Sequence, residues 1–145
     1  MGILLAHHIL QLYKRTQPPI PLSRLAMLSS VVSSKMLRSM AQTEGCRHVE
    51  TLTGFKWMGN RSLELVAEGF AVPYAFEEAI GYMFTEIVRD KDGVAAATVF
   101  LALVAELYAQ GRTVIGLLEE LYQRFVPWCM WLISGMGTLH RRIRM

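Results

Sequence analysis

The chain reads Ala71-Val72-Pro73-Tyr74-Ala75-Phe76 and then changes to Glu77-Glu78. Six mostly apolar residues followed by two carboxylates are typical of a buried strand that ends in a loop. Upstream, Leu25–Ser30 and Arg47–Leu52 predict two further strands. In an open α/β sheet, ligands collect at the carboxyl ends of the strands. Carboxylates at such an edge accept hydrogen bonds from several hydroxyls, so the pattern favours a sugar or another polyol as ligand.

Segments of helical periodicity alternate with these strands. The expected helices cover Gly2–Lys14, Lys35–Gln42, Met58–Glu68, Val94–Gln110 and Val114–Phe125. Alternation of this kind predicts an α/β fold, a three-layer α/β/α arrangement with a small, mostly parallel sheet and helices on both faces. The last twenty residues, 126–145, fit none of this organisation and are expected to form an irregular C-terminal tail.

Two details of this pattern lead to further expectations. The segment Val94–Ala109 carries one charged residue, Glu106, so it is expected to be almost wholly buried. Pro73 has no backbone N–H to donate within the third strand. That strand is therefore expected either near an edge of the sheet or with its pairing starting after Pro73.

Composition limits the class of protein. The chain has 145 residues, the size of one domain, and its 52% hydrophobic and 19% charged content exclude disorder. A net charge of +3 arises partly from the basic terminal residues 140–144, which predicts no nucleic-acid surface. The longest weakly charged runs have about twelve residues, too short to cross a membrane. Two distant cysteines and no convincing secretory signal favour a reducing compartment, and a cytoplasmic location is expected.

Two loops carry the candidate binding residues. Thr53 and Gly54 follow the second strand, where a hydroxyl and a closely approachable backbone suit a ligand, although an ordinary strand-to-helix turn explains them too. Glu77 and Glu78 follow the third strand. Adjacent residues that leave a strand point in different directions, so only one of these carboxylates need face a cleft, and both are also compatible with a solvated loop.

Lys91 lies between Asp90 and Asp92, the only aspartates of the chain. Its ammonium is a candidate to contact an oxyanion or to donate a proton at the same cleft. The two aspartates would suggest a metal pair, but capping of the following helix is a sufficient role for Asp92, and no metal site is predicted. The adjacent His7 and His8 face different directions on a helix and cannot chelate together. No phosphate-binding glycine loop, nucleophile elbow or zinc spacing occurs, so the chain shows no complete catalytic apparatus.

Four motifs in order give the chain a family resemblance. They are LSSVVSSKML (28–37), TLTGFKWMGN (51–60), FEEAIGYM (76–83) and DKDG (90–93). Together they resemble the α-D-phosphohexomutase superfamily, in particular its phosphoglucomutase and phosphopentomutase branch. The similarity covers residues 1–125 and corresponds to the third of four domains, an α/β/α unit that carries the sugar-binding loop.

The resemblance implies a role in phosphoryl transfer between the 1-position and the terminal hydroxyl of a sugar phosphate such as a ribose, deoxyribose or glucose phosphate. It places Glu77 at the glutamate that grips ring hydroxyls, with Glu78 beside it. Thr53 and Gly54 match the turn that touches the sugar, and Lys91 matches an active-site lysine. Ala79 stands where many glucose-specific members have serine, which favours the pentose-tolerant branch.

In the family, the phosphoserine loop, the magnesium loop and the phosphate-gripping loop belong to the other three domains, which only a full-length chain would supply. The chain is therefore expected to be a fragment that binds sugar phosphate without a cofactor of its own and without turnover, whereas the full-length enzyme uses magnesium. The alternative is a non-catalytic truncated isoform that acts as a weak sugar-phosphate binder or as an interaction module.

Overall fold

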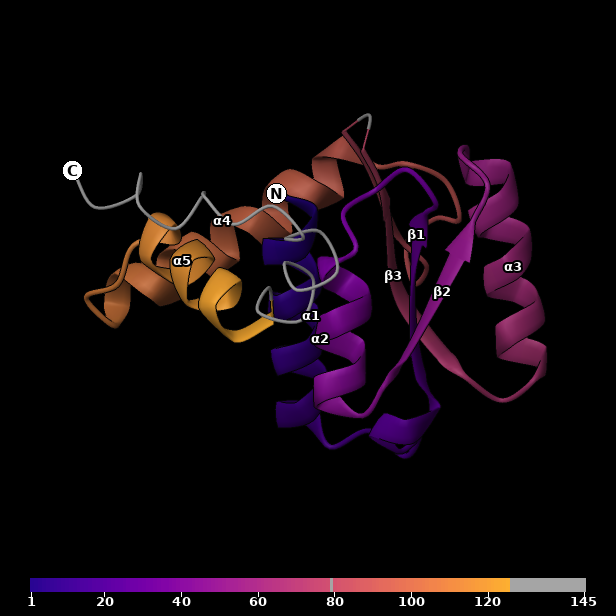
Figure 1. Ribbon diagram of the computed structural model, residues 1–145, viewed down its shortest axis with the longest axis horizontal. Coiled ribbons are helices and arrows are strands. Elements are labelled where there is room, and N and C mark those ends of the chain that lie inside the picture. Colours follow the sequence, from indigo (N-terminus) through magenta and orange to yellow (C-terminus); the bar gives the residue numbers. More distant parts are fainter. Residues whose placement is uncertain (79, 126–145) are drawn as a thin grey trace, which may run out of the picture.

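The computed structural model describes residues 1–78 and 80–125 (Figure 1), so the expected tail, 126–145, lies outside the described residues. The elements in chain order are α1 (Gly2–Thr16), the 3-10 turn η1 (Leu22–Arg24), β1 (Leu25–Ser30), α2 (Met36–Glu44), β2 (Arg47–Thr51), α3 (Phe55–Ala67), β3 (Ala71–Glu77), β4 (Gly81–Phe84), α4 (Gly93–Ala109) and α5 (Val114–Phe125).

The described strands form one mixed sheet in the order β2-β1-β3-β4. β1 pairs in parallel with both β2 and β3, and β4 pairs antiparallel with β3. The three-layer α/β/α fold with a mostly parallel sheet is thus confirmed. The sequence analysis missed β4, because four residues that are all buried show no alternation.

A break in the pairing of β1 with β3 accommodates Pro73. Leu25 pairs with Ala71, but Met27 already pairs with Tyr74, so β3 contains an extra residue. Pairing with β4 begins only at Tyr74. β3 is therefore an inner strand, and the second alternative, pairing that starts after Pro73, is the one observed with β4. A bulge leaves one residue unpaired, which removes the cost of the missing N–H.

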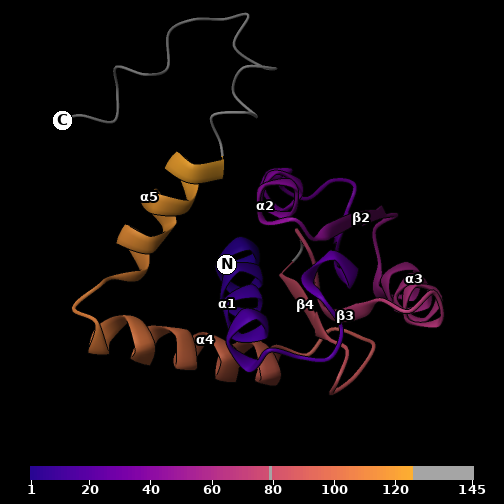
Figure 2. The ribbon, with the colours of Figure 1, turned by 90° about the horizontal axis from the view of Figure 1, so that it is seen from below.

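Helices cover both faces of the sheet. Figure 1 shows α1 and α2 on one side and α3 on the other, and Figure 2 shows α4 crossing below α1 with α5 turning away from it. The α1/α2 face buries Leu25, Met27, Tyr74 and Phe76, whereas the α3 face buries Ala26, Leu28, Val72, Ala75 and Met83. Val72 and Tyr74 lie on opposite faces because the bulge shifts the two-residue alternation.

α4 is less buried than its composition predicts, so the expectation of an almost wholly buried helix is wrong. Only one stripe packs inward, formed by Ala95, Ala96, Leu103 and Leu107. On another face Val94 is 79% exposed, Leu101 65% and Tyr108 85%. Within residues 1–78 and 80–125 no single helix has the length and hydropathy needed to cross a membrane, and α4 and α5 meet that test only as a pair bent by 94°.

Candidate functional site

The carboxyl ends of β1, β2 and β3 lie along one edge of the sheet because these strands are parallel. The turn Thr53-Gly54 follows β2, and Glu77 is the last residue of β3. The backbone N–H of Gly54 donates to Glu77 Oε2 at an N···O distance of 2.9 Å. Two motifs that are 23 residues apart in sequence are thereby joined directly across the edge, which we call the carboxyl rim.

The conformation of Gly54 makes this contact possible. Its φ of 112° lies in a region that residues with a side chain rarely adopt, and it directly precedes the first helical residue of α3. A carboxylate at this helix N-terminus is also favoured by the helix dipole. A carboxylate offers about four lone-pair sites, so one N–H leaves Glu77 with capacity for hydroxyl donors.

The neighbouring candidates face solvent. Thr53 and Glu78 are both exposed, whereas Glu77 is half-buried. The two glutamates therefore have different environments, as expected for consecutive residues at a strand end. Tyr82 lies close to this loop: burial, with a smaller contribution from the negative charge of Glu78, raises the pKa of its phenol.

Lys91 reaches the same rim by a longer path. β4 starts at the rim and runs away from it, and the segment Thr85–Asp92 returns, with the Asp92 N–H donating to the Tyr82 carbonyl at 2.8 Å. Lys91 Nζ lies 6.0 Å from the centroid of the Phe55 ring and 3.5 Å from Asp90 Oδ1. Asp92 caps α4, accepting from the Val94 and Ala95 N–H groups, so its predicted structural role is confirmed.

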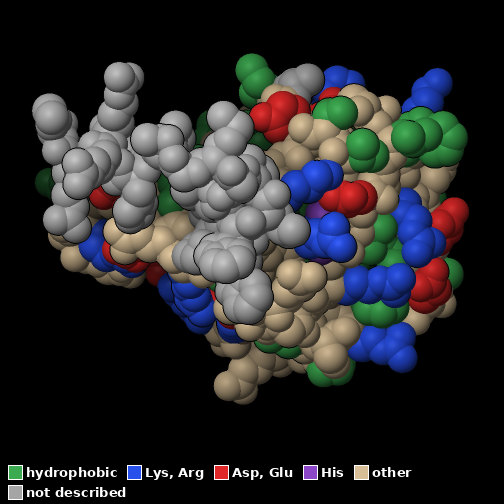
Figure 3. All heavy atoms as spheres, in the orientation of Figure 1, with side chains coloured by type: hydrophobic (Ala, Val, Ile, Leu, Met, Phe, Trp, Pro, Cys, Tyr) green, Lys and Arg blue, Asp and Glu red, His purple; other side chains and the backbone are tan. Residues whose placement is uncertain are grey.

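The rim is an open surface. Several apolar residues in the segments that follow β2 and β3 are exposed: Leu52 is 57% exposed, Trp57 56% and Ile80 80%. Figure 3 shows hydrophobic and charged side chains side by side along the upper edge of the molecule, over the strand ends. Ala79 lies outside the described residues. The described part of the chain thus brings Glu77, Gly54 and Lys91 to one edge without enclosing them.

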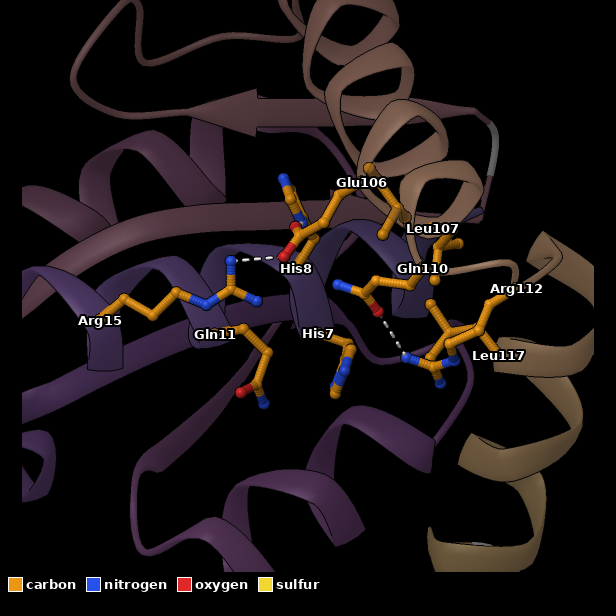
Figure 4. Close-up of a pocket in the computed structure, with 10 residues that line it drawn as sticks. His7, His8, Gln11, Arg15, Glu106, Leu107, Gln110, Arg112 and Leu117 are labelled. Carbon is orange, nitrogen blue, oxygen red and sulfur yellow. Dashed lines mark hydrogen bonds and ion pairs between the residues drawn. The ribbon is translucent and has the colours of Figure 1, made fainter.

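The hollows found in the described residues lie elsewhere. One, of about 50 Å³, lies between α1, α4 and α5, where Arg15 pairs with Glu106 at 2.5 Å and His8 Nδ1 lies 3.6 Å from the same carboxylate. Burial lowers the pKa of His8, although Glu106 opposes this. In Figure 4 His7 projects away from His8 and Glu106, as expected for adjacent helical residues. A second, open hollow of about 350 Å³ lies beside α2 and β2 and is lined by Arg38, Gln42 and His48 among others.

The described residues offer no cluster of protein ligands for a magnesium ion. Within residues 1–78 and 80–125 no three His, Cys, Asp or Glu side chains gather in a way that would hold a metal ion. Asp90 Oδ1 accepts from the Lys91 N–H, and Asp92 is engaged as a helix cap. The residues present do not fit the metal that the family resemblance implies for the full-length enzyme.

Sequence reasoning missed two residues that shape the rim, Phe55 and Gly81. A Cβ placed on Gly81 would lie 2.4 Å from Phe55 Cε2 and 2.9 Å from Glu77 Cγ. Only glycine fits there. The available signal was a glycine directly after an acidic loop, because an isolated glycine at a strand end often marks a close approach of another group.

Comparison with known proteins shows the family to which this α/β/α domain belongs. The sequence profile described as "Phosphoglucomutase/phosphomannomutase, alpha/beta/alpha domain III" matches residues 1–125. The chain therefore belongs to the phosphoglucomutase/phosphomannomutase family and corresponds to its third domain.

Relatives of this chain include mutases of pentose phosphates. It is 46% identical over 125 residues to the "Probable phosphoribomutase" of Schizosaccharomyces pombe and 44% identical over 126 residues to the "Phosphopentomutase" of Homo sapiens, covering 86% of this chain and 21% of each relative. The "Glucose 1,6-bisphosphate synthase" of Mus musculus is 39% identical over 111 residues, 77% of this chain and 18% of that protein. The chain thus spans about one fifth of these relatives.

A solved structure shows the same fold. The crystal structure of a "putative phosphomannomutase" from Thermus Thermophilus matches with a TM-score of 0.63 and 20% identity, over 84% of this chain and 25% of that one.

Proposed function

We propose that the chain is the sugar-binding domain of a phosphopentomutase-type mutase, an intramolecular phosphotransferase of carbohydrate metabolism in the cytoplasm. The hydrogen bond from Gly54 to Glu77 carries this proposal, because it unites two motifs of the family at the rim where α/β sheets bind ligands. The names of the pentose-phosphate relatives support a ribose or deoxyribose phosphate as substrate.

Each rim residue has a distinct role in this proposal. The carboxylate of Glu77, with Glu78 beside it, accepts hydrogen bonds from sugar hydroxyls, and Thr53 with the Gly54 backbone contacts the sugar from the other side. The Lys91 ammonium contacts the phosphate or donates a proton to the departing oxygen, so it is the candidate catalytic residue. By resemblance, magnesium would be held by the other domains of a full-length enzyme.

Binding tests the proposal directly. Titration of the 145-residue chain with ribose 5-phosphate, followed by backbone amide NMR shifts, should move the signals of Thr53, Gly54 and Glu77 with an affinity in the millimolar range. Glu77→Gln should weaken binding about three- to tenfold, because the hydroxyls lose a charged acceptor. Glu119→Gln, on the exposed surface of α5, is the matched control. Shifts that spread evenly over the surface, or equal weakening by both variants, would refute the site.

We also propose that a polypeptide limited to these 145 residues binds sugar phosphate without interconverting its isomers. Phosphoryl transfer depends on a positioned donor and on neutralised charge. By resemblance, the phosphoserine and the magnesium loop that supply these belong to other domains. Conversion of ribose 1-phosphate to ribose 5-phosphate above the rate of a Lys91→Ala variant would show this to be wrong.

A second candidate function, a non-catalytic interaction module, is favoured by the exposed face of α4. Val94, Leu101 and Tyr108 lie along it at intervals of seven residues, and the described exposed residues between them are uncharged. The large side chains are evenly spaced about Leu101, so the face complements itself when a second copy packs antiparallel. Sedimentation should then show a concentration-dependent dimer that Leu101→Glu abolishes, and a strictly monomeric chain would exclude this function.

A further inference from the structure

Phe55 lies close to all three motifs of the carboxyl rim: the Thr53-Gly54 turn, the 77–81 loop and Lys91. It follows Gly54 directly and is the first residue of α3. The edge of its ring, at Cε2 and Cζ, covers Gly81, which pairs with Glu77 across β3 and β4. The centroid of the same ring lies 6.0 Å from Lys91 Nζ.

The ring is fixed by its surroundings. Phe55 is 6% exposed and belongs to the core cluster between α3 and the sheet, with Met58, Leu65 and Met83. A ring buried to this degree cannot serve as a stacking platform for the sugar. The core therefore fixes the position of the ring. A group that packs against the ring is positioned by the core as well.

Lys91 has little else to place it. Its side chain is 67% exposed, and its ion-pair partner is the carboxylate of Asp90, itself 61% exposed. An ammonium within about 6 Å of an aromatic face is attracted by the ring quadrupole. The ring thus supplies a fixed point on one side of a lysine that is otherwise free to move in solvent.

We infer that Phe55 is a positioning residue that holds the Lys91 ammonium at the carboxyl rim for the sugar phosphate; this rests on the proposed function. Gly81 contributes to this arrangement, because any larger residue there would displace the Phe55 ring. Phe55 acts through Lys91 and does not itself contact the ligand.

NMR of the lysine Cε–Hε groups in the full 145-residue chain tests the position first. The chain has four lysines, Lys14, Lys35, Lys56 and Lys91, and the signal that disappears in Lys91→Met identifies Lys91. A ring current should shift that signal upfield of the other three. The shift should persist in Phe55→Tyr, which keeps the ring, and disappear in Phe55→Leu. An unshifted Lys91 signal in the wild-type chain would overturn the inference without any change to the buried Phe55, since the exposed Lys91→Met variant is needed only to assign the signal.

A double-mutant cycle tests the consequence for binding. Phe55→Leu should weaken ribose 5-phosphate binding about two- to fivefold, as loss of an exposed cation–π contact implies, and Phe55→Tyr should restore it. In the Lys91→Met background the same Phe55→Leu change should have no effect. Equal weakening in both backgrounds would assign Phe55 to packing alone and overturn the inference. A shifted Lys91 signal with no binding by the wild-type chain would instead refute the proposed function, and with it the role for the ligand.

Discussion

Acidification should destabilise the fold through His48, a half-buried residue of β2. Its Nε2 lies 2.8 Å from the hydroxyl oxygen of Ser29, which is 1% exposed on the central strand β1. Burial lowers the pKa of His48 from 6.5 to about 4, with the carboxylate of Glu50 opposing the shift and the cations Arg38 and Lys35 adding to it. The neutral ring is therefore the form that the folded protein favours.

The sign of the effect follows from linkage. The pKa of His48 is lower in the folded state than in the unfolded chain, so the unfolded chain binds more protons between the two values. The stabilisation is complete above about pH 6.5 and is lost as the pH falls toward about 4. Between about pH 7.5 and about pH 5, a pKa shift of this size lowers the free energy of unfolding by about 2 kcal/mol. Because His48 is only half-buried, solvent screening reduces this to about 1 kcal/mol.

Urea unfolding followed by far-UV circular dichroism measures the effect at both pH values. The wild-type chain should lose about 1 kcal/mol more than His48→Gln, whose amide can still bond to Ser29 but does not titrate. His7 and His8 also have lowered pKa values because they are buried, but they are common to both proteins and cancel in the difference. Equal losses in the two proteins, or a larger loss in the variant, would refute the assignment.

Two further substitutions test the segment that carries Lys91. Asp92→Ala should lower the free energy of urea unfolding by about 1 kcal/mol, because α4 loses the cap that accepts two N–H groups. The control Asp90→Ala should cost much less, and equal costs would contradict the capping role of Asp92. Gly59→Ala should cost about 1–3 kcal/mol, because its Cβ would lie 2.9 Å from the Arg89 carbonyl oxygen. Gly93→Ala is the control, because a Cβ there meets nothing within 4 Å. Thermal unfolding measures the stability of both variants, and similar losses of stability would exclude overpacking at Gly59.

Most of the fold could be predicted from the sequence because periodicity and local breakers agree. β1 was predicted with its observed bounds, Leu25–Ser30, and α5 likewise, with the Thr113 hydroxyl accepting the Gly116 N–H. α3 begins at Phe55, three residues before the predicted start at Met58. The earlier start depends on the hydrogen bond between the Gly54 N–H and Glu77. A contact between residues that are distant in sequence cannot be detected from local periodicity.

The features that could not be predicted depend on tertiary neighbours. β4 has four buried residues, and its strand character comes from pairing with β3. The exposure of α4 could not be read from its composition, because an almost uniformly apolar helix does not reveal which face has neighbours. Pro73 indicated an irregularity in the pairing of β3. The form of that irregularity could not be predicted, because it depends on the register between β1 and β3.

The carboxyl rim, too, could be predicted only in part from the sequence. Motif order indicated that Thr53, Gly54, Glu77 and Lys91 belong together, and strand direction indicated the edge where the first three would meet. The approach of Lys91 required more, since β4 leads away from the rim and the segment Thr85–Asp92 has to return. Phe55 and Gly81, which set that approach, carry no functional group, so a search for chemically active side chains passes over them.

The openness of the rim sets the strength of binding that the domain can have alone. A hydrogen bond made in the presence of water contributes about 0.5–1.5 kcal/mol, so three or four contacts to a sugar give about 4 kcal/mol, a dissociation constant in the millimolar range. Stronger binding requires that water be excluded, because electrostatic contacts strengthen as the local dielectric falls. Leu52, Trp57 and Ile80, in the segments that follow β2 and β3, expose apolar surface that a covering domain would bury. The same surface that makes the rim a weak site in isolation therefore suits it to form one wall of a closed site in a longer mutase.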